Sequence, residues 1–202
     1  MFALIENQQI TKFYNGNKGV TLGDIQYPRS IFTLWSEAER NAIGIFEVTV
    51  DTTNRKDEQW YINTNVSYGV ESNKAIGSYG IATAKAHADT LFTAQDETDG
   101  KGTEGEVATR GLKYNLIQTI KNQAAGELSK TDWYITRKSD AGTAVPSAIT
   151  THRAAVRTKA AAQETQITNA SDTPALETLY TYTTNDAGVT SRPLGEIPKL
   201  ES

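Results

Sequence analysis

The feature that most constrains this chain is a short segment near its middle. Residues 95–106, QDETDGKGTEGE, contain no apolar residue and three glycines. Such a segment has nothing to bury and predicts a linker or an exposed loop. The residues before it alternate in the manner of β-strands, and the residues after it repeat with helical spacing. We therefore expect a domain over 1–94, a linker over 95–106, a second domain over 107–182, and an extended tail over 183–202.

The first domain has the pattern of a β-sheet. Apolar and polar side chains alternate along its strand-like runs, as they do when one face of a sheet is buried. Asn7-Gln8 separates the first two runs and predicts a hairpin turn. The expected strands cover residues 2–5, 9–14, 45–50, 59–68 and 75–84.

One short helix is expected inside this β-rich domain. Ser36 precedes Glu39 by three residues, the spacing at which two side chains satisfy each other's free backbone donors at a helix start. Gly44 suits the end of the same helix because glycine adopts the left-handed conformation that often terminates helices. The sequence therefore predicts a helix over residues 36–43.

The second domain has helical periodicity. Apolar residues recur at steps of three and four over residues 107–128 and again over 147–170, where most of them are alanine. Pro146 suits the first turn of the second helix, and a third helix is expected over 174–180. The fold class is therefore α+β, a small antiparallel β-rich domain followed by a helical domain resembling a helix-turn-helix hairpin. The expected apolar faces are Leu112, Leu116, Ile117, Ile120, Ala124 and Leu128, then Ile149, Ala155, Val156, Ala160, Ala162 and Ile167.

Composition excludes several classes of site. Hydrophobic residues make up 38% of the 202 residues and cysteine is absent, so no disulfide, thiolate nucleophile or cysteine-ligated metal is available. Two histidines offer little material for a histidine-based centre, and we expect no metal and no cofactor. The net charge of −4 does not favour nucleic acid or an anionic membrane. No apolar run reaches the ~18 residues of a membrane span, and the first residues do not resemble a signal peptide.

No catalytic signature stands out. The chain has no phosphate-binding loop, dinucleotide fingerprint, zinc-protease motif or nucleophile elbow. The acidic run at 96–100 breaks the ligand order of an EF-hand, so it predicts a solvated loop rather than a calcium site. His87 and Asp89 form a pair that could exchange a proton, but no nucleophile accompanies them, and a surface pair is expected. The sequence predicts a protein that is not an enzyme.

Four residues are candidates for binding another protein. The aromatic pair Trp133 and Tyr134 either covers the open end of a small helical core or anchors a partner, because aromatic residues dominate interface energies. Arg153 and Arg157 are four residues apart and share a helix face, where they either orient a partner's carboxylates or form an ordinary solvated surface.

The same region resembles a known family. The segment from Leu128 to Lys138 (LSKTDWYITRK), the turn before Val145-Pro146, and the helix containing His152-Arg153-Ala-Ala-Val156-Arg157 together resemble the C-terminal part of tail-fibre assembly proteins and related small tail proteins of tailed bacteriophages. A T-D-W motif, a polar turn with proline and an R-x-x-V-R helix carry the resemblance, which is strongest over residues 107–160. The opening MFALIENQQITKFY is also similar to the start of such proteins.

The resemblance implies a partner and a cellular setting. It implies a protein that binds a tail-fibre or baseplate component, either helping the fibre to assemble in a chaperone-like role or remaining in the particle as a fibre, baseplate or neck component. The host cytoplasm during assembly is the expected location, with the virion tail as the alternative. Association with further copies of the chain is left open, as is an enzyme of unfamiliar type.

Overall fold

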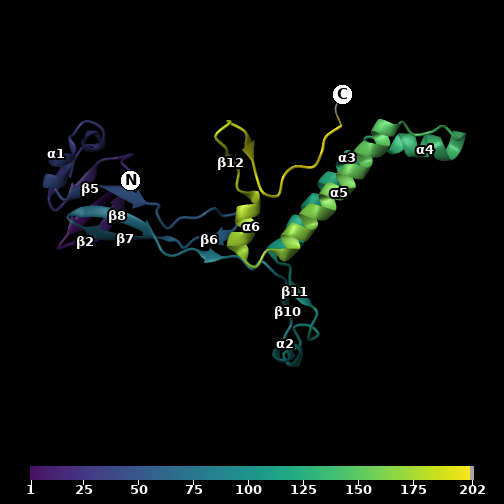
Figure 1. Cartoon of the computed structure of the whole chain (residues 1–202). Helices are drawn as coiled ribbons and strands as arrows, with labels where there is room; N and C mark the ends of the chain where they lie inside the picture. Colours follow the sequence, from purple (N-terminus) through teal and green to yellow (C-terminus); the bar gives the residue numbers. More distant parts are fainter. Residues whose placement is uncertain (201–202) are drawn as a thin grey trace. The chain divides into compact units, whose positions relative to one another are not determined.

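The computed structural model describes residues 1–200 and divides the chain into two compact units, with the boundary between Thr83 and Ala84. Unit 1 contains the larger sheet and unit 2 contains the long helices (Figure 1). The predicted α+β class, with a β-rich first part and a helical second part, is confirmed.

Unit 1 is built around a five-stranded sheet in the order β2-β1-β5-β8-β7. A separate β3–β4 hairpin and two short helical segments accompany it. The elements are β1 (Phe2–Glu6), β2 (Gln9–Tyr14), β3 (Val20–Leu22), β4 (Ile25–Tyr27), the 3-10 helix η1 (Arg29–Phe32), α1 (Glu37–Ala42), β5 (Ile45–Asp51), β6 (Tyr61–Ile62), β7 (Val66–Glu71) and β8 (Lys74–Tyr79), with β9 (Thr83–Ala84) at the boundary.

The sheet differs from the antiparallel prediction in one pair. Strands β1, β2 and β5 are antiparallel neighbours and β7 and β8 form an antiparallel hairpin, but β5 and β8 run parallel. The long connection over residues 52–65 allows the hairpin to present its second strand, rather than its first, to β5. Parallel neighbours require such a connection because a tight turn reverses the chain.

The expected single strand over residues 59–68 is wrong. Only β6 and β7 form, and the side chain of Asn63 lies between them, where it accepts a hydrogen bond from the Lys56 amide and donates one to the Lys56 carbonyl, both at 2.8 Å. The hydroxyl of Thr64 accepts the Gly80 amide at 2.7 Å. These two side chains satisfy backbone groups of loops, so the strand pairing is interrupted between β6 and β7. The alternation of apolar residues does not reveal this interruption.

Two tight turns fix the registers of the hairpins. Asn7 and Gln8 have φ values of 52° and 62°, and Ser72 and Asn73 have 49° and 58°. Two successive residues with positive φ form the turn that matches the twist of paired strands. The side-chain amide of Gln8 donates to Asn73 at 2.9 Å, so the two turns hold each other in place. The predicted turn at Asn7-Gln8 is confirmed.

Unit 1 has a small core on one face of the sheet. The sheet curls far enough for the rings of Phe13 on β2 and Tyr68 on β7, from its opposite edges, to approach to 4.9 Å. The predicted capping box is present: the Ser36 hydroxyl accepts the Glu39 amide, and the Glu39 carboxylate accepts the Ser36 amide. The buried cluster consists of Val20, Ile31, Phe32 and Ile45, against which Phe2, Leu4, Tyr14, Leu22, Tyr27, Trp35 and Ile43 pack.

Unit 2 is organised by two long helices, α3 and α5, that lie side by side (Figure 1). Its elements are β10 (Thr90–Leu91), α2 (Ala94–Thr98), β11 (Val107–Thr109), α3 (Leu112–Ser129), α4 (Asp132–Ala141), α5 (Ser147–Asn169), α6 (Thr173–Tyr180), β12 (Thr183–Thr184) and β13 (Thr190–Ser191).

The expected linker, residues 95–106, lies inside unit 2. It contains most of α2 and is closed by the antiparallel pair β10 and β11. The Asp96 carboxylate accepts hydrogen bonds from the Thr93 backbone N–H, the Thr93 hydroxyl and the Lys101 ammonium, and these lower the pKa of Asp96 to about 2. Side-chain hydrogen bonds, rather than burial, therefore order this acidic segment, and the division of the chain lies ahead of it.

The contact between α3 and α5 follows a repeat of three and four residues in both helices. The predicted buried residues of α5, namely Ile149, Val156, Ala160 and Ile167, are confirmed. Two polar residues occupy positions in the same repeat, Glu127 seven residues after Ile120 and Gln163 seven residues after Val156. Both are buried, whereas the predicted Ala155 and Ala162 are exposed. The helix expected from residue 107 begins at Leu112, because residues 107–109 pair as β11.

The extended tail predicted over residues 183–202 has more structure than expected. Residues 183–191 form the β12–β13 hairpin, and Leu194 is fully buried. Residues 201–202 lie outside the described part of the chain. The third helix is confirmed as α6, and α4 is a helix that the sequence reading treated as a connection.

Candidate functional site

The site that the structure offers is the helix α4 together with the residues that hold its first turn. One nitrogen of the Arg153 guanidinium, Nη1, lies within hydrogen-bonding distance of three acceptors from the junction of α3 and α4. They are the Leu128 carbonyl at 2.8 Å, the Thr131 hydroxyl at 2.7 Å and the Asp132 carboxylate at 2.8 Å. Arg153 therefore ties α5 to the start of α4.

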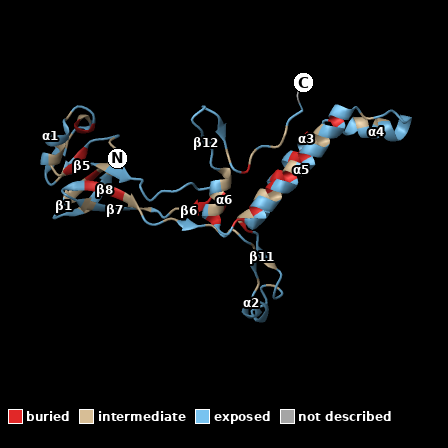
Figure 2. Cartoon of the chain, viewed as in Figure 1, coloured by how far each residue is buried: buried red, intermediate tan, exposed pale blue. Residues whose placement is uncertain are grey.

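The helix α4 has no buried face. None of its ten residues is buried, and Figure 2 shows α4 in the colours of exposed and intermediate residues. Trp133 is 51% exposed and Ile135 is 44% exposed. An isolated helix of this length is marginal in water, because its hydrogen bonds barely offset the entropy of ordering it. The chain thus presents apolar side chains on a helix that its own core does not use.

An aromatic and cationic cluster lies on α4. The rings of Trp133 and Tyr134 approach to 3.7 Å at an angle of 31°. The guanidinium of Arg137 lies 4.8 Å from the Trp133 ring and 5.4 Å from the Tyr134 ring. Within residues 1–200, Arg137 forms no ion pair. This cluster combines a flat apolar surface with a positive charge.

The four predicted site residues do not form one constellation. Arg153 forms an ion pair with Asp132, the residue before Trp133. Arg153, Trp133 and Tyr134 therefore lie together at the start of α4. Arg157 lies one turn further along α5, is exposed, and takes no part in that junction. Sequence reasoning missed Arg137. Its spacing of four from Trp133 would have indicated it once residues 132–141 were recognised as a helix.

A second polar cluster surrounds the buried carboxylate of Glu127. Its Oε1 accepts the Leu200 amide at 2.8 Å and lies 3.3 Å from the Nε2 of His152, while its Oε2 accepts the Lys130 ammonium. The hydrogen bond from Lys130, followed by that from the Leu200 amide, lowers the pKa of Glu127. The ionised carboxylate therefore holds the end of the described chain against α3.

The lowered pKa of Glu127 predicts a pH dependence. A carboxyl whose pKa is lower in the folded than in the unfolded state stabilises the fold above its ordinary pKa, and this contribution disappears as pH falls through the folded value. We expect Glu127→Gln to lower the melting temperature at pH 7 by a few degrees, with the gap to wild type closing below about pH 4. Melting curves across this range test it, and a gap independent of pH would contradict it.

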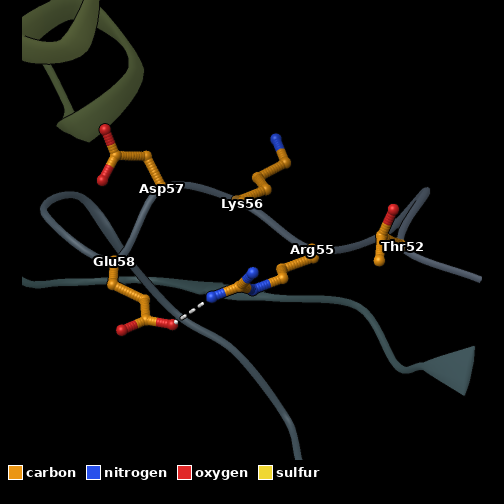
Figure 3. A pocket seen from close by; sticks show the side chains of 5 residues that line it. All are labelled: Thr52, Arg55, Lys56, Asp57 and Glu58. Atoms are coloured by element: carbon orange, nitrogen blue, oxygen red, sulfur yellow. Dashed lines mark hydrogen bonds and ion pairs between the residues drawn. The ribbon is translucent and has the colours of Figure 1, made fainter. Parts of the chain in front are cut away.

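Two hollows accompany these features. One of about 660 Å³ lies between α3 and the last described residues, with Glu127, Lys130 and Ile197 among its lining residues. The other, of about 560 Å³, is formed by the loop from Thr52 to Glu58 in unit 1. Figure 3 shows Arg55 directed at Glu58, with which it forms a 3.0 Å ion pair, while Lys56 and Asp57 point elsewhere. Its charged side chains do not converge on a common point.

The structure also bears on the His87–Asp89 pair and on metal sites in the described part of the chain. Asp89 accepts hydrogen bonds from Gly111 and Arg110 rather than from His87. No group of three or more histidine, aspartate or glutamate side chains within residues 1–200 is placed to hold a metal ion. Among these residues no helix has the length and apolar character needed to cross a membrane.

No protein-family model, no curated protein and no solved structure matches this chain.

Proposed function

We propose that this chain is a binding module, not an enzyme, and that it holds another protein against α4. The observation that carries the proposal is a ten-residue helix without a buried residue, anchored at its start by Arg153 and exposing Trp133 and Ile135. Tryptophan and arginine are the residue types that most often dominate binding energies. A partner that covers α4 would bury these side chains and stabilise a helix that has little support of its own.

The total surface supports the same conclusion. The chain exposes 13113 Å², whereas two separate compact globules with the masses of the two units would expose ~11,200 Å² in all. Segments of unit 2 that bury almost nothing, such as α4 and the β12–β13 hairpin, contribute to this excess. The excess is larger than the ~800 Å² that one partner contributes to an interface of standard size.

The resemblance of residues 107–160 indicates which partner to test first. We propose a tail-fibre or baseplate protein of a tailed bacteriophage, with the chain acting as an assembly or chaperone-like protein in the host cytoplasm. The alternative is a permanent component of the virion tail. Copy number in purified particles separates the two roles, because a permanent component is present at a fixed stoichiometry and an assembly protein is absent.

The role of α4 leads to a binding prediction. We expect Trp133→Ala to weaken binding to the purified tail-fibre protein about 30-fold, equivalent to ~2 kcal/mol. The melting temperature should change little, because half of the side chain already faces solvent. Isothermal titration calorimetry measures the first quantity and differential scanning calorimetry the second.

A matched control uses another exposed apolar residue. Leu34 in unit 1 is more exposed than Trp133 and lies outside the proposed surface. Leu34→Ala should bind the tail-fibre protein as wild type does. Wild-type affinity in Trp133→Ala, or an equal loss in both variants, would contradict the assignment of α4 as the contact surface.

A further inference from the structure

The last described residues run along the helices of unit 2 as a strap, which we define as residues 193–200. Its Leu194 side chain is fully buried, and the Leu194 amide donates to the Leu179 carbonyl at 3.1 Å. The preceding residues, 181–191, are exposed throughout. The strap is therefore held at specific points and joined to α6 by a segment with no burial of its own.

The contacts from α5 recognise the main chain of the strap. The side-chain amide of Gln163 donates to the carbonyls of Leu194 at 3.3 Å and of Gly195 at 2.9 Å. Gln166, three residues further along α5, donates to the Pro193 carbonyl at 3.4 Å. Contacts with backbone carbonyls are available to any extended peptide. Leu194 is the strap side chain that is fully buried, so we expect the groove to select chiefly for a leucine there.

Gln163 is only partly satisfied by this arrangement. It is 1% exposed, yet its Oε1 has no hydrogen-bond partner within residues 1–200. A buried acceptor without a donor costs free energy that a better-placed ligand would recover. The strap therefore uses the donor half of this buried amide and leaves the acceptor half unused.

The strap also fits loosely between its two ends. Beyond Gly195 the next contact with α3 is the hydrogen bond from the Leu200 amide to Glu127. Between them lies the hollow of about 660 Å³, bounded by Gln123, Gly126, Glu127 and Lys130 on α3 and by Glu196, Ile197 and Lys199 of the strap. The hollow is open to solvent, so these strap residues have no packed neighbours on that side. The middle of the strap is thus not packed as core.

We propose that this face of α3 and α5 is a peptide-binding groove and that the strap is its exchangeable resident ligand. The groove takes an extended peptide with a leucine near one end. Backbone carbonyls of the peptide around that leucine accept hydrogen bonds from Gln163 and Gln166. A backbone amide six residues after the leucine donates to Glu127. The occupant to which we commit is the 193–200 segment itself, supplied in trans by a second copy of the chain or by a synthetic peptide. This site is separate from α4 and does not depend on the role proposed for that helix.

The test uses the full chain and a fluorescein-labelled synthetic peptide spanning residues 191–202. In wild type the resident strap competes at high effective concentration and should keep binding weak. Leu194→Asp places a charge in a buried position and should release the strap while leaving α3 and α5 in place. We expect fluorescence anisotropy to show that this variant binds the peptide at least about tenfold more tightly than wild type does.

Two controls identify the groove as the site. A peptide carrying the same Leu194→Asp change should not bind, and adding Gln163→Leu to the Leu194→Asp chain should abolish binding while keeping the apolar contact between the helices. Equal peptide affinity for wild type and the Leu194→Asp chain, or no binding to either, would overturn the proposal.

A second measurement needs no variant and decides the matter if Leu194→Asp loses its helical circular dichroism. Amide hydrogen exchange in the unmodified chain should release the Leu194 and Leu200 protons together, about 100-fold faster than those of Ile120 and Val156 in the helices. Exchange of the strap amides at the helix rate would mean that the strap is an integral part of the core and would overturn the proposal.

Discussion

Replacing Gly111 by alanine is expected to lower the free energy of unfolding of unit 2 by about 3 kcal/mol, since overpacking against backbone is among the costlier changes. A Cβ atom at this position would meet the main-chain carbon and oxygen of Ala88. Backbone atoms cannot move aside as the end of a flexible side chain can. The clash would separate the start of α3 from the segment before β10.

That segment does more than lie close to Gly111. Carbonyls of Ala86 and His87 accept the amides of Leu112 and Lys113, which are donors that a helix start leaves free. Asp89 accepts the Gly111 amide at 2.8 Å and pairs with Arg110. A displaced backbone therefore loses several hydrogen bonds at once. Guanidinium denaturation followed by helical circular dichroism measures the loss.

Gly126 provides the matched control for Gly111. It lies inside α3, and a Cβ atom there would meet nothing within 4 Å. Alanine is preferred to glycine within a helix by roughly 0.5–1 kcal/mol, so Gly126→Ala should stabilise unit 2. The two glycine-to-alanine changes should have opposite signs. A stabilising or neutral Gly111→Ala would refute the close approach of Ala88.

The second large effect concerns Arg153. We expect Arg153→Met to destabilise unit 2 by about 2–3 kcal/mol, because a charged donor that serves three acceptors disappears and the fully buried Thr131 hydroxyl loses that donor. Methionine keeps much of the side-chain volume, so the change reports the polar contacts. Chemical denaturation gives the free energy, and circular dichroism reports the loss of helix at α4.

Arg157 is the control for Arg153, four residues along the same helix. Its side chain is exposed and takes no part in the α3–α4 junction, so Arg157→Met should change stability by less than about 0.5 kcal/mol. Equal effects of the two substitutions would contradict the anchoring role of Arg153. Arg153 already pairs with Asp132 within the chain. The hypothesis that both arginines orient a partner's carboxylates therefore fits Arg157 better than Arg153.

Local signals predicted much of the fold. The capping box at Ser36 and Glu39, the turn at Asn7-Gln8 and the apolar repeat of α5 are confirmed, because each depends on residues within a few positions of one another. The strand over 59–68 failed for the opposite reason. Its apolar and polar residues alternate as they do in a strand, but Asn63 and Thr64 form hydrogen bonds with loop residues that no local pattern identifies.

The candidate site was predicted in part. The sequence indicated Trp133 and Tyr134 as a pair, and α4 does expose Trp133. It could not separate Arg153 from Arg157, because the spacing that places them on one helix face says nothing of what that face meets. Glu127 and Gln163 were missed for a related reason, since polar residues at apolar positions are normally assigned to the surface.

By itself, the sequence determined the order of β-type and helical segments, the ends of the capped helix α1, and the absence of cysteine chemistry. These properties follow from backbone preferences, side-chain periodicity and composition, which are local. The tertiary structure alone decided the parallel pairing of β5 and β8, the binding of Arg153 to the α3–α4 junction, and the docking of the strap on Gln163 and Glu127. Each of these joins residues distant in sequence, and their pairing depends on the whole packed arrangement, in which a polar group is buried only where a partner satisfies it.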